Sequence, residues 1–184
     1  MWGKLVAVAF AVILFLLPCC AEDSLLEEEY RNMMDSVPKD VAGLLPDGFF
    51  DGIDGAASEL DEVPVGAIVV RDGKIIARAY NTRERDKNAL CHAEIKAIRK
   101  ACKKLGGWRL WACEMFVTLE PCPMCAGALA WSQIGKIVYG ASDPKRGFSQ
   151  FSPSLMHPKT QVVSGVLADE CSSLVTEFFR NKRS

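Results

Sequence analysis

The fold and the chemistry of this chain are decided by two short stretches, Cys-His-Ala-Glu at 91–94 and Glu-Pro-Cys-Pro-Met-Cys at 120–125. They supply one imidazole and two thiols that are separated by two residues. Zinc accepts nitrogen and sulfur ligands of this kind, and a catalytic zinc site keeps three protein ligands and leaves a fourth position open. The expected ligands are therefore His92, Cys122 and Cys125, holding one zinc ion per subunit.

A carboxylate, Glu94, follows the imidazole by two positions. Beside the open position it can take a proton from water, give it to a ring nitrogen, and later protonate the departing ammonia, which is general acid–base catalysis. Neither stretch is specific alone, because Cys-x-x-Cys also occurs in redox and structural zinc sites. Together, with Pro121 before the first thiol, they match the pattern of zinc nucleobase deaminases. A buried histidine with two unpaired core cysteines is the less favoured interpretation.

Apolar runs around these stretches predict alternating strands and helices. Asp-Gly at 72–73, between two β-rich runs, indicates a hairpin of strands at 65–71 and 74–80. The other expected elements are helices at 92–105, 123–133 and 168–180, strands at 115–119, 136–140 and 161–166, and a weaker helix at 49–60. This order predicts an α/β fold with a mixed sheet and helices on its faces.

Charge divides the chain into two parts. Residues 21–62 contain 13 acidic and two basic residues, whereas residues 63–184 contain 10 acidic and 19 basic residues. We interpret residues 22–48 as an acidic linker and residues 49–184 as the catalytic domain. The basic balance of the domain suits a polyanionic partner, because Lys and Arg neutralise phosphates. A solvated basic surface without a partner is the alternative.

The first 21 residues resemble a signal segment. A basic residue precedes the uncharged apolar run at 5–17, which has the length of a signal-peptide core and is short for a membrane span. Cleavage after Ala21 and a misassigned start, with Met33 or Met34 as the first residue, are both open. A cytoplasmic location is expected, with no stable membrane association of the catalytic domain.

Four further cysteines lie in or beside apolar stretches, and we expect them to be small buried hydrophobic residues rather than disulfide partners: Cys91, Cys102, Cys113 and Cys171. His157 lies in a proline-flanked loop. It is expected to be structural, with a position near the substrate as the alternative.

From about Asp61 to Arg183 the chain resembles the bacterial tRNA-specific adenosine deaminases. The resemblance is carried by Glu-Val-Pro-Val-Gly-Ala at 62–67, His-Ala-Glu-Ile at 92–95, Val-Thr-Leu-Glu-Pro-Cys-Pro-Met-Cys-Ala-Gly-Ala at 117–128, Gly-Val-Leu-Ala-Asp-Glu-Cys at 165–171 and Phe-Phe-Arg-Asn-Lys-Arg at 178–183. It implies a cytidine-deaminase-like three-layer α/β/α sandwich with a mixed central sheet.

The resemblance also implies one zinc ion, a homodimer, and hydrolytic deamination of the wobble adenosine to inosine in the anticodon loop of tRNA. It implies that Asn81 contacts the substrate nucleotide. It further implies that RNA is contacted by Phe179, Arg180, Lys182 and Arg183.

Two other functions are weighed against this one. A deaminase of a free nucleobase or nucleoside, of the guanine or cytosine type, is one alternative, because Trp131 in its sequence context is similar to guanine deaminases. A zinc-stabilised structural domain is the other. Glu94 argues against it, because a structural zinc site normally closes with a fourth protein ligand.

Overall fold

The structure is a computed structural model, and it describes residues 61–151 and 155–183. The signal-like segment at 1–21, the acidic linker at 22–48 and the helix expected at 49–60 lie outside the described residues.

Five strands form one mixed sheet in the order β2-β1-β3-β4-β5. The central antiparallel part consists of β1 (Gly66–Arg71), which pairs with both β2 (Lys74–Tyr80) and β3 (Glu114–Leu119). The parallel part consists of β4 (Lys136–Ala141), which pairs with β3 and with β5 (Gln161–Ser164). The mixed sheet expected from the sequence is therefore confirmed.

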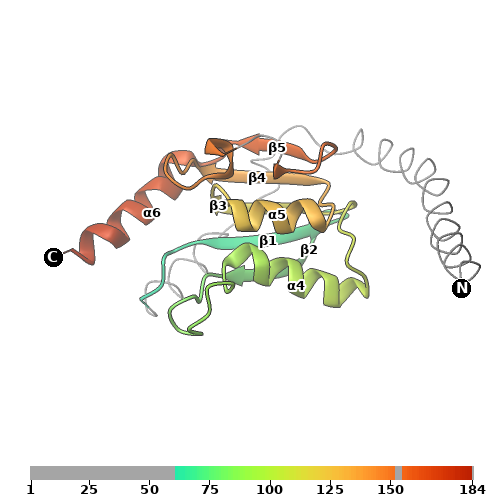
Figure 1. The fold of residues 1–184 in the computed structure, drawn as a ribbon, viewed down its shortest axis with the longest axis horizontal. Coiled ribbons are helices and arrows are strands. Elements are labelled where there is room, and N and C mark those ends of the chain that lie inside the picture. The colour runs from blue at the N-terminus through green and yellow to red at the C-terminus, as the bar shows by residue number, and fades with distance from the viewer. Residues whose placement is uncertain (1–60, 152–154, 184) are drawn as a thin grey trace, which may run out of the picture. The chain divides into compact units, whose positions relative to one another are not determined.

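Three α-helices and one short 3₁₀ helix complete the described chain (Figure 1). They are α4 (Ala93–Leu105), α5 (Pro123–Trp131), η2 (Phe148–Gln150) and α6 (Ala168–Asn181). Every strand and α-helix expected after residue 64 is present, with ends that differ by at most two residues. The 3₁₀ helix was not expected, because a single turn leaves no periodic pattern.

The turns that separate these elements have clear local causes. Asp72 and Gly73 have φ values of 50° and 68°, so both central residues of the β1–β2 hairpin adopt the left-handed conformation that this turn requires. Gly106 ends α4 with φ 70°, and its amide donates to the carbonyl of Cys102. A left-handed glycine of this kind is a common helix stop.

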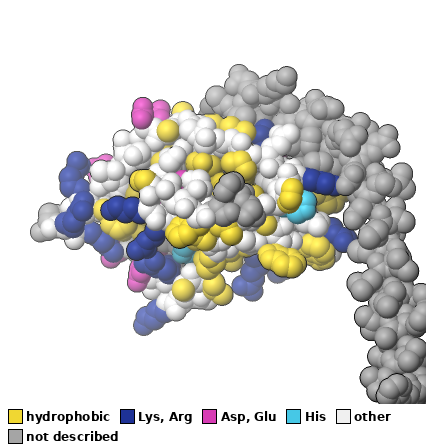
Figure 2. All heavy atoms as spheres, turned by 45° about the horizontal axis from the view of Figure 1, so that its top comes forward, with side chains coloured by type: hydrophobic (Ala, Val, Ile, Leu, Met, Phe, Trp, Pro, Cys, Tyr) yellow, Lys and Arg dark blue, Asp and Glu magenta, His cyan; other side chains and the backbone are white. Residues whose placement is uncertain are grey.

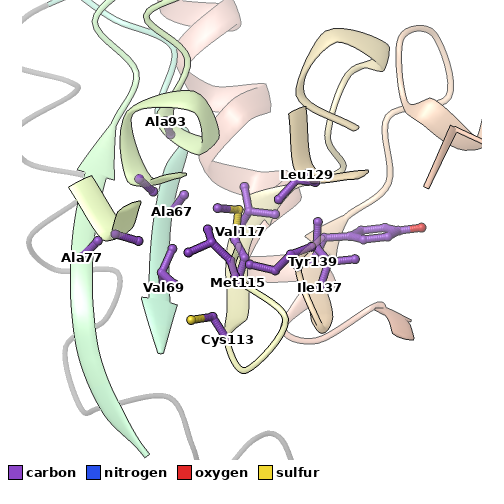
Figure 3. Packing of buried hydrophobic residues seen from close by; sticks show 14 of the residues in the cluster. Ala67, Val69, Ala77, Ala93, Cys113, Met115, Val117, Leu129, Ile137 and Tyr139 are labelled. Atoms are coloured by element: carbon purple, nitrogen blue, oxygen red, sulfur yellow. The ribbon is translucent and has the colours of Figure 1, made fainter. Parts of the chain in front are cut away.

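Alanines allow α4 to lie close to the sheet. On the helix, Ala93, Ala97 and Ala101 are fully buried, and they meet Ala67 of β1 and Ala77 of β2 in the main hydrophobic core. Figure 3 shows this cluster, in which Met115 and Val117 of β3 lie between the alanines and Leu129 of α5. Small side chains at the contact bring the helix backbone, and with it the residues at its start, near the strand ends.

The opposite face of the sheet carries α6, which completes three layers. Cys171 of α6 is buried, and it lies so close to Gly140 of β4 that a Cβ atom on this glycine would come within 2.3 Å of its sulfur. Residues on either side, Tyr139 and Ala141, are buried as well, and Tyr139 belongs to the core under α4 and α5. The expected α/β/α arrangement is confirmed. Among the described helices, none combines the length and the apolar character of a membrane span.

Candidate active site

The two motifs begin two helices that lie on the same face of the sheet. His92 is the N-cap residue of α4 and Cys122 the N-cap residue of α5, both with extended backbone conformation. Pro123 opens α5, where no amide donor is needed. Because α4 and α5 pack against each other, their starts bring together residues 30 positions apart in the chain. The structure therefore assembles the expected metal ligands.

The three ligand atoms are spaced as a tetrahedral metal site requires. The Nδ1 atom of His92 lies 3.8 Å from the Sγ atom of Cys122 and 3.6 Å from that of Cys125, and all three ligand atoms lie within 4.8 Å of one another. Zinc bonds of about 2.0–2.1 Å to nitrogen and about 2.3 Å to sulfur place tetrahedral ligands roughly 3.6 Å apart. The donor set and its spacing both fit zinc.

Hydrogen bonds within this cluster already favour one thiolate. Hydrogen bonds from Cys125 and from His92 lower the pKa of the Cys122 thiol to about 4. Cys125 donates a hydrogen bond to Cys122, and this bond, together with burial, raises the pKa of the Cys125 thiol. The hydrogen bond with Cys122 also raises the pKa of His92. The metal-free cluster thus holds protons that a bound cation displaces.

Glu94 lies in the first turn of α4, and its side chain is buried with 3% exposure. Burial raises the pKa of its carboxyl group, because desolvation disfavours the charged form. Its Oε2 atom is buried and has no hydrogen-bond partner within the described part of the chain. A buried polar atom without a partner is rare in native proteins, so this oxygen is available to a water molecule or a substrate group.

Asn81, at the end of β2, is held by a buried carboxylate that the sequence did not point to. Its Nδ2 atom donates to Oε2 of Glu62 at 2.9 Å, and Oε1 of Glu62 accepts the backbone amide of Arg85 at 2.8 Å. The next amide, that of Thr82, donates to the carbonyl of Cys91 at 3.0 Å. This hydrogen bond therefore joins the residue after Asn81 to the residue before His92.

Glu120 connects the second motif to the loop after β4. Its Oε2 atom accepts the amide of Asp143 at 2.9 Å, and its Oε1 atom accepts the amide of Ser149 at 3.0 Å. The amide of Phe148 donates to the carbonyl of Pro121 at 2.9 Å. Glu120 belongs to the second motif. Its contacts with Asp143 and Ser149, which lie 23 and 29 residues further along the chain, could not be predicted from the sequence. An acidic residue at the end of an apolar strand was the available signal.

The four residues expected to contact RNA lie at the end of α6. Phe179 is 44% exposed, and Arg180 forms an ion pair with Glu177 at 3.6 Å. Lys182 forms an ion pair with Asp61 at 3.1 Å, and Arg183 is exposed. Figure 2 shows Lys and Arg side chains gathered at the end of this face where α6 finishes, at the left of the view. No contact joins these residues to the metal ligands within the described chain.

The remaining cysteines and the second histidine behave in different ways. Cys113 and Cys171 are buried, as expected, but Cys91 and Cys102 are partly exposed, and for these two the expectation was wrong. Cys91 lies just before α4 and Cys102 lies in the helix itself, at positions where burial is incomplete. No disulfide joins the six cysteines of the described chain. The Nδ1 atom of His157 accepts the amide of Lys159 at 3.2 Å, which fits a structural role in its own turn.

Known proteins similar to this chain are deaminases, which agrees with the ligand cluster described above. The family model of MafB19-like deaminases matches residues 52–183. The tRNA-specific adenosine deaminase of Bacillus subtilis (strain 168) is 48% identical over 132 residues, which cover 69% of this chain and 82% of that protein. The chain belongs to the tRNA-specific adenosine deaminase family. A second member, from Agrobacterium fabrum, is 43% identical over 70% of this chain and 88% of its own length.

Solved structures of the family share the fold. One from a study of A-to-I editing by tRNA:A34 deaminases at the wobble position is 38% identical, with a TM-score of 0.62 over 68% of this chain and 97% of that chain. The guanine deaminase of Nitrosomonas europaea is 27% identical, with a TM-score of 0.63 over 71% of this chain and 81% of that chain. The fold thus serves both tRNA and free-base deaminases, and the substrate must be argued separately.

Proposed function

We propose that this protein converts the wobble adenosine of a tRNA to inosine by zinc-dependent hydrolysis. The observation that carries the proposal is the cluster of His92, Cys122 and Cys125, assembled beside the buried carboxylate of Glu94, in a chain 48% identical to a tRNA-specific adenosine deaminase. A bound zinc ion supplies a Lewis acid that lowers the pKa of water toward neutrality.

The residues of the chain provide the remaining parts of the reaction. His92 and the two thiolates hold the metal at the start of two helices, where free backbone amides favour anionic sulfur. Burial raises the pKa of Glu94, which suits a carboxyl group that alternately accepts and donates a proton. It would take one proton from the attacking water and give it to the purine ring nitrogen, and then take a second proton from the new C6 hydroxyl and give it to the leaving ammonia. Asn81 orients the nucleotide.

Basic residues around this site support an RNA substrate rather than a free base. The loop after β4 carries the exposed side chains of Lys145 and Arg146, and the end of α6 carries those of Arg180 and Arg183. Phosphate groups are the natural partners of such side chains, and a free base has none. We propose that Phe179, Arg180, Lys182 and Arg183 contact the RNA around the extruded base.

Deamination of free guanine is the second candidate, favoured by the structural likeness to the Nitrosomonas europaea enzyme. A panel of substrates separates the two. Purified zinc-loaded protein is incubated with a tRNA carrying adenosine at the wobble position, the matching anticodon stem-loop, free adenosine, guanine and cytosine. We expect inosine in both RNAs and no turnover of the free compounds. Turnover of guanine or cytosine alone would overturn the proposal.

We also propose that the protein is a homodimer. Trp131, at the end of α5, is 83% exposed, which is unusual for so large an apolar side chain in a monomer. Sedimentation of the full chain should give a dimer, and Trp131→Glu should shift the equilibrium toward monomer. A wild-type monomer at micromolar concentration would contradict this.

A tRNA substrate also implies a cytoplasmic location, which cell fractionation and the intact mass of the native protein test.

A further inference from the structure

Helix α4 carries a row of basic side chains that the deamination chemistry does not use. We call it the α4 basic row; it consists of Lys96, Arg99, Lys100, Lys103 and Lys104. All except Lys96 are exposed, and Lys96 is partly exposed. The one carboxylate of the helix, Glu94, is buried at the active site. The outer surface of α4 is therefore uniformly positive.

The carboxylate of Asp86 lies near the start of this row, where it accepts a hydrogen bond from the Thr82 hydroxyl at 2.7 Å and lies close enough to Lys96 to interact with its charge. Within the described residues, none of its members forms an ion pair; Lys96 instead donates to Oγ1 of Thr82 at 2.6 Å, and its ammonium lies 5.0 Å from the ring centre of Tyr80. Lys100 donates to the backbone carbonyl of Arg78 at 2.7 Å. These contacts hold two of the side chains on the β2 side of the helix. Among the described residues, the four exposed members Arg99, Lys100, Lys103 and Lys104 have no ion-pair partner.

Helix stability does not account for the whole row. Lys103 and Lys104 lie in the last turn, where positive charge is favoured by the helix dipole. Arg99 and Lys100 lie before that turn. They face Lys103 and Lys104 at the i,i+4 spacing, where like charges repel and destabilise an isolated helix. A charge arrangement that opposes folding in the free protein becomes favourable when a polyanion binds to it.

The row leads away from the active site. It begins at Lys96, whose partners Tyr80 and Thr82 flank Asn81 in the sequence. It then follows α4, whose 13 residues span about 20 Å. Just beyond the helix, Trp108 is 54% exposed and stacks with the guanidinium of Arg109 at 4.6 Å. A chain of phosphates that enters the site can therefore continue along the exposed basic residues of α4, a helix whose own carboxylate, Glu94, is buried.

We infer that the α4 basic row binds the phosphate backbone of the base-paired RNA stem next to the loop that enters the active site. This inference rests on the proposed function, and it extends the substrate from the loop to the stem. Lysine and arginine act here as point charges, so the contact is independent of RNA sequence and weakens as salt rises. The row begins at Lys96, which contacts the two residues that flank Asn81, and this position favours RNA over an anionic membrane surface.

The test compares a neutralised row with a row that keeps its charge. Arg99 and Lys103 are exposed and have no ion pair in the described chain, so R99Q/K103Q removes two charges and R99K/K103R is the matched control. Dissociation constants are measured by fluorescence anisotropy at several KCl concentrations. The ligands are a full-length tRNA with adenosine at the wobble position and an oligonucleotide of the anticodon loop without its stem. Glutamine, lysine and arginine have similar helix propensities, so folding is preserved.

For tRNA, we expect the slope of log K against log salt to fall in magnitude by about two in R99Q/K103Q, one for each lost phosphate contact, and to stay near wild type in R99K/K103R. The loss of affinity should be at least fivefold larger for tRNA than for the loop oligonucleotide. An unchanged slope, or an equal loss for both RNAs, would overturn the inference. Vesicles containing phosphatidylserine are measured in the same way. A variant that loses affinity only for these vesicles, with RNA affinity unchanged, would also overturn the inference. Failure of the proposed function looks different, because wild-type protein would then produce no inosine in any RNA.

Discussion

The carboxylate of Glu62 holds the side-chain amide of Asn81 through a hydrogen bond of 2.9 Å, and both residues are almost completely buried. Because the Nδ2 atom of Asn81 donates to this carboxylate, its Oδ1 atom remains as the acceptor that a nucleotide meets. Glu62 also accepts the amide of Arg85, so one carboxylate fixes both the amide and the loop that follows it. If Asn81 contacts the nucleotide as proposed, Glu62 positions it for that contact.

Replacing Glu62 tests this relationship. Glu62→Gln substitutes an NH₂ donor for one acceptor oxygen, so either Asn81 or the amide of Arg85 loses its partner. Leaving a buried donor unpaired costs about 1–3 kcal/mol. We expect a lower free energy of unfolding, measured by urea titration, and a raised KM for RNA with a smaller change in kcat. A variant with wild-type stability and KM would show that Asn81 does not depend on Glu62.

Removing the carboxylate of Glu94 should separate metal binding from turnover. Glu94→Gln and Glu94→Ala leave His92, Cys122 and Cys125 in place, so zinc content measured by atomic absorption should stay near one per chain. Turnover should fall by about 10²–10⁴-fold, the usual contribution of a general acid–base residue. Retained activity would assign proton transfer to another group. Loss of zinc in Glu94→Gln would assign it a role in metal binding.

Zinc binding should release protons, and its affinity should rise with pH. The pKa of Cys122 is lowered to about 4, so this thiol is already ionised at pH 7, whereas the raised pKa of Cys125 keeps its proton on the sulfur. We expect the release of at least one proton per zinc, measured by calorimetry in buffers of different ionisation enthalpy. Affinity should weaken as pH falls, because protons compete with the metal.

A matched control for the zinc site is available in the core. Cys113 is a buried thiol with a pKa raised to about 11 by burial, and it belongs to no metal cluster among the described residues. Cys113→Ala should therefore keep full zinc content, whereas Cys122→Ala should lose it. Equal zinc content in the two variants would contradict the ligand assignment.

Two glycines should respond in opposite ways to the same change. A Cβ atom on Gly147 would come within 2.3 Å of the Glu120 carboxylate, whereas one on Gly127, inside α5, meets nothing within 4 Å. Gly147→Ala should destabilise the protein by about 1–3 kcal/mol, as overpacking does. Gly127→Ala should stabilise it by about 1 kcal/mol at most, through helix propensity. Thermal unfolding of both variants gives the comparison, and equal shifts would argue against the close approach at Glu120.

Local features of the sequence were enough for most of the fold. The hairpin followed from Asp72-Gly73, because both positions need positive φ. The starts of α4 and α5 followed from the two motifs, and Gly106 marked the end of α4. These are contacts within a few residues along the chain, where composition and spacing carry the information. The chemistry of the zinc cluster was visible for the same reason, because each half of it is local.

Contacts between distant segments were not visible. Glu62 and Asn81 are 19 residues apart, and Glu120 and Ser149 are 29 apart. The local pattern does not show the partner of either carboxylate, although the position of Glu120 at the end of an apolar strand was a signal for its burial. The partial exposure of Cys91 and Cys102 was missed similarly, because apolar neighbours in sequence do not guarantee burial in the fold. Tertiary structure decides which acids position the substrate and which cysteines are covered.

The central claim is that the cluster at the starts of α4 and α5 deaminates adenosine in tRNA. The most direct measurement is nucleoside mass spectrometry of a tRNA transcript with adenosine at the wobble position, after incubation with the full zinc-loaded protein. The account predicts one inosine per tRNA, located at that position by fragment analysis, and none with Glu94→Gln. Unmodified adenosine at the wobble position after prolonged incubation, in a protein that contains zinc and is folded, would contradict it.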